Sequence, residues 1–163
     1  MRVGVVGAGA LGFHHIRLLK TIDGADLVGF YDHNPTRAPY VAKELETTAF
    51  PSLEALLERA EAITVVVPTS AHVDVGLTVL ERGIHALVEK PLADTLPGAE
   101  QLVHTARERG LILQVGHVER FNRAVRAATP YLEEPRFLQT ERLAPFQPRG
   151  THVAVILDLV VHH

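Results

Sequence analysis

The chain has 163 residues, of which 47% are hydrophobic and 21% are charged, and its formal net charge is −3. This length suits one domain with a sizeable core, the modest negative charge does not indicate a nucleic-acid partner, and the lack of cysteine excludes disulfides, thiolate catalysis and cysteine-bound zinc. No apolar run approaches the roughly 20 residues of a membrane helix, and a strand-like run follows Met1 directly, so we expect a cytoplasmic protein with no signal peptide and no membrane contact.

The N-terminal segment predicts a dinucleotide-binding loop. A β-branched run at 2–6 leads into a GxGxxG pattern, and apolar residues at helical spacing follow over 10–21. In such a unit the first glycine permits a tight turn, the second lets the backbone approach a pyrophosphate, and the third lets helix and strand pack closely. The helix N-terminus adds unpaired amides for the phosphates. The residues expected to contact the coenzyme here are Gly7, Gly9, Ala10, Leu11 and Gly12.

The second apolar run, at 26–31, ends at Asp32, which lies about twenty residues beyond the last glycine, as the dinucleotide pattern requires. Its carboxylate can accept hydrogen bonds from the adenosine ribose hydroxyls and favours NAD, because the 2′-phosphate of NADP would meet its negative charge. Arg37 keeps NADP possible. The alternative is a βαβ unit that binds nothing.

The rest of the N-terminal region alternates between strand-like and helix-like segments, the pattern of a parallel sheet covered by helices. Ser52 and Thr95 are placed as helix N-caps, and Gly83 and Gly110 lie where helices should end. The predicted strands span 2–6, 26–31, 62–67, 84–89 and 111–115, and the predicted helices span 10–21, 36–46, 52–59, 71–82 and 95–109. The fold class predicted is α/β, a doubly wound parallel sheet of the Rossmann type over residues 1–117.

Polar residues follow the strands predicted at 62–67 and 84–89, at the sheet edge where open α/β folds bind ligands. Lys90 can hydrogen-bond a substrate hydroxyl and lower its pKa, or it is an ordinary surface lysine. Glu89 can pair with a nearby cation, in a catalytic or a purely structural role. His72 is expected at a helix start near the coenzyme. The residues expected at this part of the coenzyme site are Pro68, Thr69, His72, Glu89 and Lys90.

The character of the sequence changes after Gly116. A more polar helix is predicted at 117–129, a half-buried strand at 135–143 and a proline-rich loop at 145–150, whereas 153–163 suits either helix or strand. On a helix, Asp158 and His162 would share one face, and the carboxylate could orient the imidazole.

The histidines divide into two groups. His117 and His162 are suited to accept a proton near neutral pH. His162 with its neighbour can instead be the remnant of a purification tag. Adjacent residues on a helix point about 100° apart, so His14 and His15 are interpreted as structural and no metal site is predicted.

Several segments together resemble the Gfo/Idh/MocA oxidoreductase family, and the resemblance covers essentially the whole chain. They are Gly7 to His15, Asp32, Pro68 to His72, Glu89 to Leu92 and Val115 to Asn122. The sharpest is the EKP tripeptide at the end of the strand predicted at 84–89. Residues 116–122 and 142–148 are most similar to the subgroup that acts on nucleotide-linked amino sugars.

The resemblance implies an NAD(P)-dependent oxidoreductase that moves a hydride between a nicotinamide coenzyme and a sugar or nucleotide-sugar hydroxyl. In the family scheme, His162 takes the hydroxyl proton, Lys90 polarises the same oxygen and Asp158 orients the histidine. A second α/β domain with a mostly antiparallel sheet would bind the substrate and build a homo-oligomer. The alternative function is a dinucleotide-binding module without turnover.

The sequence departs from the family pattern in two places. The chain stops at His163, where the family usually continues with His-Asp and a large further part, and Arg123 replaces a common proline. We therefore expect residues 118–163 to be the incomplete beginning of the substrate and oligomerisation domain. The apolar segments near 136–143 and 153–161 would then lack their usual partners and favour self-association.

Overall fold

The computed structural model describes residues 1–132 and residue 137. Its centre is a five-stranded parallel sheet in the order β2-β1-β3-β4-β5. The strands are β1 (Arg2–Val6), β2 (Asp26–Tyr31), β3 (Ala62–Val65), β4 (His85–Val88) and β5 (Leu113–Val115). The predicted α/β class and the predicted order of strands and helices over residues 1–117 are confirmed.

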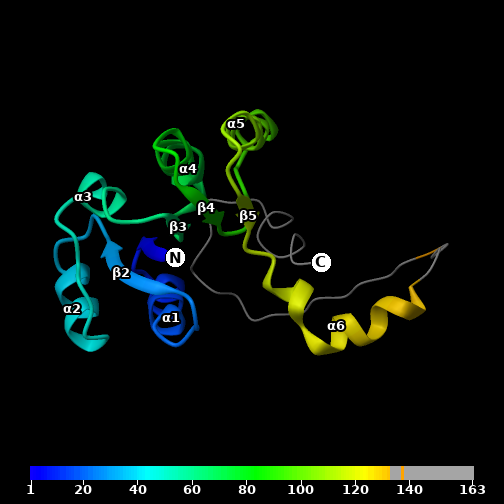
Figure 1. The fold of residues 1–163 in the computed structure, drawn as a ribbon. Helices are drawn as coiled ribbons and strands as arrows, with labels where there is room; N and C mark the ends of the chain where they lie inside the picture. Colours follow the sequence, from blue (N-terminus) through cyan, green and yellow to red (C-terminus); the bar gives the residue numbers. More distant parts are fainter. Residues whose placement is uncertain (133–136, 138–163) are drawn as a thin grey trace.

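Helices cover both faces of the sheet (Figure 1). The helices are α1 (Ala10–Leu19), α2 (Arg37–Glu44), α3 (Leu53–Leu57), α4 (His72–Glu81), α5 (Leu96–Glu108) and α6 (Arg123–Ala128), with short turns η1 (Thr69–Ala71), η2 (Val118–Phe121) and η3 (Thr129–Tyr131). Ile16 and Phe30 belong to the core beneath α1 and α2, whereas Leu56, Leu80 and Leu102 belong to the core beneath α3, α4 and α5. The central strands β1 and β3 are therefore buried from both sides, which explains their nearly continuous apolar runs.

The strand order places a topological switch point between β1 and β3. From β1 the chain moves outward to β2, and it then crosses back to β3 on the other side of β1. The loops that follow β1 and β3 consequently leave the sheet in opposite directions and open a crevice at its carboxyl edge. Open α/β sheets bind ligands at this position.

The predicted capping residues occupy their expected positions. The Ser52 side chain accepts a hydrogen bond from the Ala55 N–H, and Thr95 does the same for Gly98. Gly83 and Gly110 have φ of +77° and +64°, the left-handed conformation that glycine adopts without a steric penalty.

The segment after β5 differs from the prediction of one helix over 117–129. Asn122 is extended there, with φ of −62° and ψ of 129°, and it separates η2 from α6. Its side chain accepts a hydrogen bond from the Ala124 N–H. Asparagine is a strong N-cap residue, so the helix begins anew at Arg123 instead of continuing from His117.

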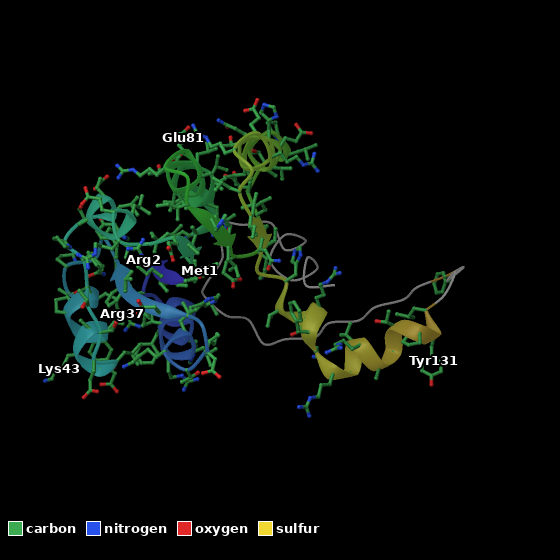
Figure 2. All side chains as sticks on the ribbon, in the orientation of Figure 1. Met1, Arg2, Arg37, Lys43, Glu81 and Tyr131 are labelled. Atoms are coloured by element: carbon green, nitrogen blue, oxygen red, sulfur yellow. The ribbon has the colours of Figure 1, made fainter. Side chains whose placement is uncertain are left out.

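The η2–α6–η3 segment extends beyond the sheet (Figure 1) and carries apolar side chains in solvent. Phe121 is 71% exposed and Tyr131 is 88% exposed; Figure 2 labels Tyr131 near the far end of this segment. Within residues 1–132, no helix is both long and apolar enough to cross a membrane. The predictions for 135–143, 145–150 and 153–163, together with Asp158 and His162, lie outside the described residues.

Candidate functional site

The glycine loop joins β1 to α1, and two of its glycines are required by close backbone packing. Gly7 has φ of +94°, and a Cβ there would lie 2.4 Å from the carbonyl oxygen of Val66. A Cβ on Gly12 would lie 1.9 Å from the carbonyl oxygen of Gly7. Gly9 is different, because a Cβ there would meet no atom within 4 Å. The space beside Gly9 is therefore open to a ligand.

The N-terminus of α1 is suited to an anion. Its N-cap residue, Gly9, provides no side-chain hydrogen bond to the first turn, and Ala10 and Leu11 are exposed. The N–H groups of such a turn carry partial positive charge and bind phosphate. A pyrophosphate therefore fits this end of the loop.

Asp32 follows β2 and lies against the glycine loop. Its side chain is 9% exposed, and its two carboxylate oxygens accept hydrogen bonds from the backbone N–H groups of Ala8, at 2.6 Å, and Asn34, at 2.8 Å. The predicted ribose-binding acid is thus fixed at the carboxyl edge, beside the open space at Gly9.

Arg37 holds the outer side of the same loop. Its Nε donates a hydrogen bond to the Ala8 carbonyl at 2.7 Å, and its Nη2 donates to the Gly9 carbonyl at 3.3 Å. The guanidinium carbon also lies 5.3 Å from the ring centroid of Tyr40 and 5.9 Å from that of Phe13. Figure 2 labels Arg37 near the start of α2. The structure therefore brings a cation to the glycine loop, where Asp32 also accepts a hydrogen bond from the backbone of Ala8.

His72 connects the segments after β3 and β4. Its ring nitrogens lie 2.8 Å from the carbonyl oxygen of Pro91 and 2.9 Å from that of Val67, and the residue is 1% exposed. Because both nitrogens contact backbone oxygens inside the protein, His72 holds the two loops together and has no ring nitrogen available for the coenzyme. Pro68 and Thr69 lie on the loop that it tethers.

Glu89 and Lys90 follow β4 at the carboxyl edge, and both are half-buried. The Glu89 carboxylate lies 3.1 Å from the Nε2 atom of His15 on α1, and its other oxygen accepts a hydrogen bond from the Lys90 N–H at 3.3 Å. The Lys90–Pro91 peptide bond is cis. Glu89 therefore contacts an imidazole supplied by α1, the helix that follows the glycine loop.

The environment of Glu89 lowers the pKa of its carboxyl group. Burial acts in the opposite direction and raises the pKa, but the hydrogen bond and charge of His15, the Lys90 N–H and the Lys90 charge together outweigh it. A carboxylate whose pKa is lower in the folded than in the unfolded protein stabilises the fold above its ordinary pKa, and this contribution is lost as the pH falls through the folded value.

This pKa shift predicts how a Glu89→Gln variant responds to acid. The wild type should be more stable than the variant at pH 7, and the difference should shrink as the pH falls below about 4.5, because the wild-type carboxyl then becomes protonated. Urea unfolding followed by circular dichroism at several pH values measures the difference. Glu108→Gln is the control, since Glu108 forms an exposed pair with His104. A difference that grows as the pH falls below about 4.5 would contradict the prediction.

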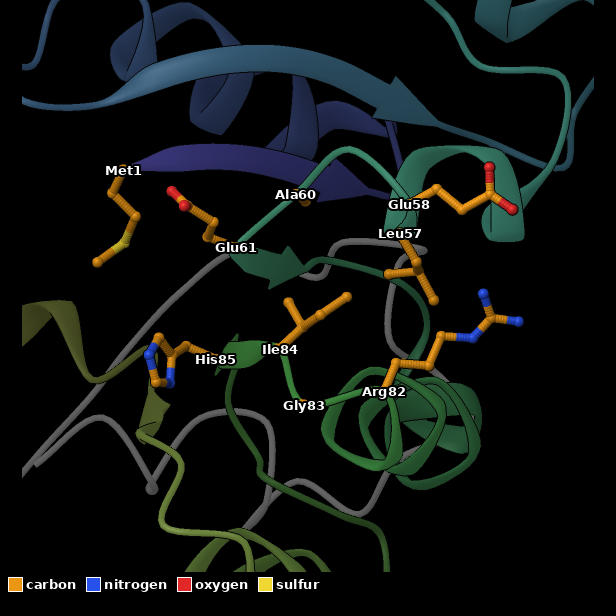
Figure 3. Close-up of a pocket in the computed structure, with 9 residues that line it drawn as sticks. All are labelled: Met1, Leu57, Glu58, Ala60, Glu61, Arg82, Gly83, Ile84 and His85. Atoms are coloured by element: carbon orange, nitrogen blue, oxygen red, sulfur yellow. The ribbon is translucent and has the colours of Figure 1, made fainter.

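A cavity of about 830 Å³ lies at the opposite edge of the sheet. Figure 3 shows its lining residues around the amino ends of β1, β3 and β4, among them Met1, Glu61 and His85. Beside it, the Arg2 guanidinium lies 3.5 Å from the Glu61 carboxylate. Among the residues that the structure describes, no predicted site residue lines this cavity, so its size does not mark the coenzyme site. Across residues 1–132 and 137, no three His, Asp or Glu side chains form a group suited to a metal ion.

Comparison with known proteins gives a consistent result. The Gfo/Idh/MocA profile, described as an oxidoreductase family with a NAD-binding Rossmann fold, matches residues 1–117. UDP-N-acetylglucosamine 3-dehydrogenase of Acidithiobacillus ferrooxidans is 41% identical over 99% of the chain and 51% of its own length. A solved structure of that enzyme superimposes with a TM-score of 0.92, covering 99% of the chain and 54% of the solved one.

More distant relatives share the N-terminal part. The scyllo-inositol 2-dehydrogenase (NAD(+)) of Bacillus subtilis is 36% identical over 76% of the chain and 37% of its own length. The structure of GenD2 from gentamicin A biosynthesis, solved in complex with NAD, is 27% identical with a TM-score of 0.76 and covers 82% of the chain and 39% of its own. The chain thus spans about half the length, or less, of these relatives.

Proposed function

Because the chain belongs to the Gfo/Idh/MocA oxidoreductase family, which has a NAD-binding Rossmann fold, we propose that it serves hydride transfer between a nicotinamide coenzyme and a sugar or nucleotide-sugar hydroxyl. One observation carries the proposal: the glycine loop with Asp32 and the Glu89–Lys90 segment lie along the same carboxyl edge, joined through His15. A dinucleotide laid across the switch point would place its adenosine near Asp32 and its nicotinamide toward Lys90.

The adenosine end supports NAD as the coenzyme. The carboxylate of Asp32 has little exposure and would repel the 2′-phosphate of NADP. Arg37 supplies a positive charge nearby, but its guanidinium already binds two loop carbonyls and lies near Tyr40. A 2′-phosphate that Arg37 attracts would still lie near the negative charge of Asp32, so we propose NAD as the preferred coenzyme.

When bound, the nicotinamide ring supplies the hydride acceptor or donor. In the oxidation direction, the carbon that bears the hydroxyl loses a hydride and the hydroxyl loses a proton. We propose that Lys90 donates a hydrogen bond to this oxygen and stabilises its developing negative charge. His162 would accept the proton and Asp158 would orient the imidazole, with residues 118–163 as the beginning of the substrate domain. The similarity to a UDP-N-acetylglucosamine 3-dehydrogenase supports a nucleotide-linked amino sugar as the substrate. The homo-oligomer that the family resemblance implies is part of the same proposal.

Coenzyme titration followed by a turnover assay tests the proposal. We expect NADH to bind more tightly than NADPH, measured by NADH fluorescence and calorimetry, and UDP-N-acetylglucosamine to reduce NAD, measured by absorbance. Lys90→Ala should lower kcat about a hundredfold or more with little change in NADH affinity. Lys43→Ala is the control, because Lys43 is an exposed residue in the last turn of α2 (Figure 2).

Each negative result has a separate meaning. Failure to bind NADH at millimolar concentration would overturn the proposal altogether. Tight NADH binding without turnover, unaffected by Lys90→Ala, would favour the second candidate function, a dinucleotide-binding module.

A further inference from the structure

The Glu89 carboxylate occupies a narrow space between three elements at the carboxyl edge. It is reached by His15 from α1, by the Lys90 N–H from its own segment, and by the turn that follows β5. The side chains of Glu89 and His15 are 13% and 23% exposed. Both are therefore largely removed from water, where an ion pair is screened much less than at a surface.

Gly116 leaves room for that carboxylate. A Cβ at position 116 would lie 2.6 Å from one Glu89 oxygen and 2.7 Å from the other. Any residue with a side chain would displace the carboxylate from His15. The turn after β5 thus leaves the space that the Glu89 carboxylate needs to reach His15. An ion pair between long side chains at a surface needs no such space.

The segment that carries Lys90 is held from both faces of the sheet. On the face covered by α1, Glu89 contacts His15; on the face covered by α4, the Pro91 carbonyl contacts His72 (Figure 1). Lys90 lies between these two attachments. Because the first turn of α1 is suited to the pyrophosphate, the His15–Glu89 contact connects the phosphate-binding helix to the segment of Lys90.

We propose that His15 and Glu89 are positioning residues that fix Lys90 and the nicotinamide half of the coenzyme site relative to α1. This inference rests on the proposed function, because it presupposes that a nicotinamide dinucleotide binds in the crevice. The groups that face Glu89 are the imidazole of His15 and the charge of Lys90. Loss of either partner of the pair should loosen the nicotinamide half and leave the adenosine half, built on Asp32 and Arg37, intact.

Two ligands separate the halves of the site. ADP-ribose contains the adenosine, the pyrophosphate and the second ribose of NADH. NADH carries the nicotinamide ring in addition. Calorimetry with His15→Ala and Glu89→Gln should show NADH affinity lowered about tenfold and ADP-ribose affinity changed by less than about twofold. The double variant should be no weaker than either single variant, since the two residues act as one unit.

Three further variants test the role of the pair. Gly116→Ala should reproduce the selective loss of NADH affinity, because it displaces the carboxylate without removing a charged group. His15→Gln, whose side-chain amide can donate to Glu89, should recover part of the affinity. His14→Ala is the matched control: it changes the neighbouring histidine, which is exposed and lies edge-on to Phe13, and should leave both affinities unchanged.

The outcomes distinguish the inference from the proposed function. If wild-type protein binds neither ligand, both are overturned. If it binds both ligands, but the variants lower the affinities for NADH and ADP-ribose equally or lower neither, only the positioning role is overturned. Circular dichroism and thermal unfolding accompany each titration and show whether each variant is folded. If a variant is unfolded, its loss of both affinities says nothing of positioning, and the test then uses His15→Gln, which retains a donor and should fold. Should His15→Gln fold and bind NADH no better than His15→Ala, the positioning role is likewise overturned.

Discussion

Replacing Gly12 with alanine is expected to lower the free energy of unfolding by about 3 kcal/mol. Alanine is the better helix former by about 1 kcal/mol, which alone would stabilise α1. The added Cβ, however, would lie 1.9 Å from the carbonyl oxygen of Gly7 and 2.8 Å from its carbonyl carbon. These are backbone atoms of the loop that enters the helix, so they cannot rotate away as a side chain can. The cost of the steric overlap should therefore exceed the gain in helix propensity, and the variant should be less stable.

Urea unfolding followed by circular dichroism measures the effect of Gly12→Ala. We also expect the variant to lose NADH binding, because α1 can avoid the overlap only by moving away from β1 and the loop. An unchanged unfolding midpoint together with unchanged NADH affinity would show that the close approach of helix and strand is not needed.

Replacing Gly9 with alanine should have the opposite profile, with stability nearly unchanged and coenzyme binding lost. A Cβ at Gly9 meets no atom within 4 Å, so the free energy of unfolding should change by no more than about 0.5 kcal/mol. In the dinucleotide-binding pattern this glycine lets the backbone approach the pyrophosphate. The methyl group would stand where the phosphates must lie, and NADH affinity should fall about a hundredfold.

ADP-ribose makes the Gly9→Ala prediction specific. It carries the same pyrophosphate as NADH, so Gly9→Ala should lower the affinities for both ligands to a similar extent. The variants of His15 and Glu89 should lower the affinity for NADH and leave that for ADP-ribose nearly unchanged. Retention of ADP-ribose binding by Gly9→Ala would contradict a pyrophosphate at this loop, and a large loss of stability would contradict the open space beside the glycine.

The local features of the fold were predictable because each depends on a few neighbouring residues. Gly83 and Gly110 end helices in the left-handed conformation, and Ser52 and Thr95 cap helices with their hydroxyl groups. Asn122 shows the limit of this reasoning. The polar composition of 117–129 suits a helix, yet the side chain of Asn122 favours capping a new helix over continuing the old one.

The long-range contacts of the candidate site were not predictable in the same way. His15 and Glu89 are far apart in the sequence, and their side chains meet only because β1, β3 and β4 lie next to one another in the sheet. The one available signal was the position of His15, on the first helix after the glycines, and it was interpreted as structural. His72 was expected at the coenzyme because of its place in the sequence, but two backbone carbonyls surround its ring. The roles of Asp158 and His162 stay predictions.

The contacts of Asp32 and Arg37 have a kinetic consequence. Asp32 accepts a hydrogen bond from the Ala8 N–H while Arg37 donates to the Ala8 and Gly9 carbonyls, so contacts within the protein hold the loop on two sides. A coenzyme that meets a site already in shape loses little entropy in ordering it. Substitutions near Asp32, where we propose that the adenosine binds, should then leave the association rate constant nearly unchanged and raise the dissociation rate constant of the dinucleotide.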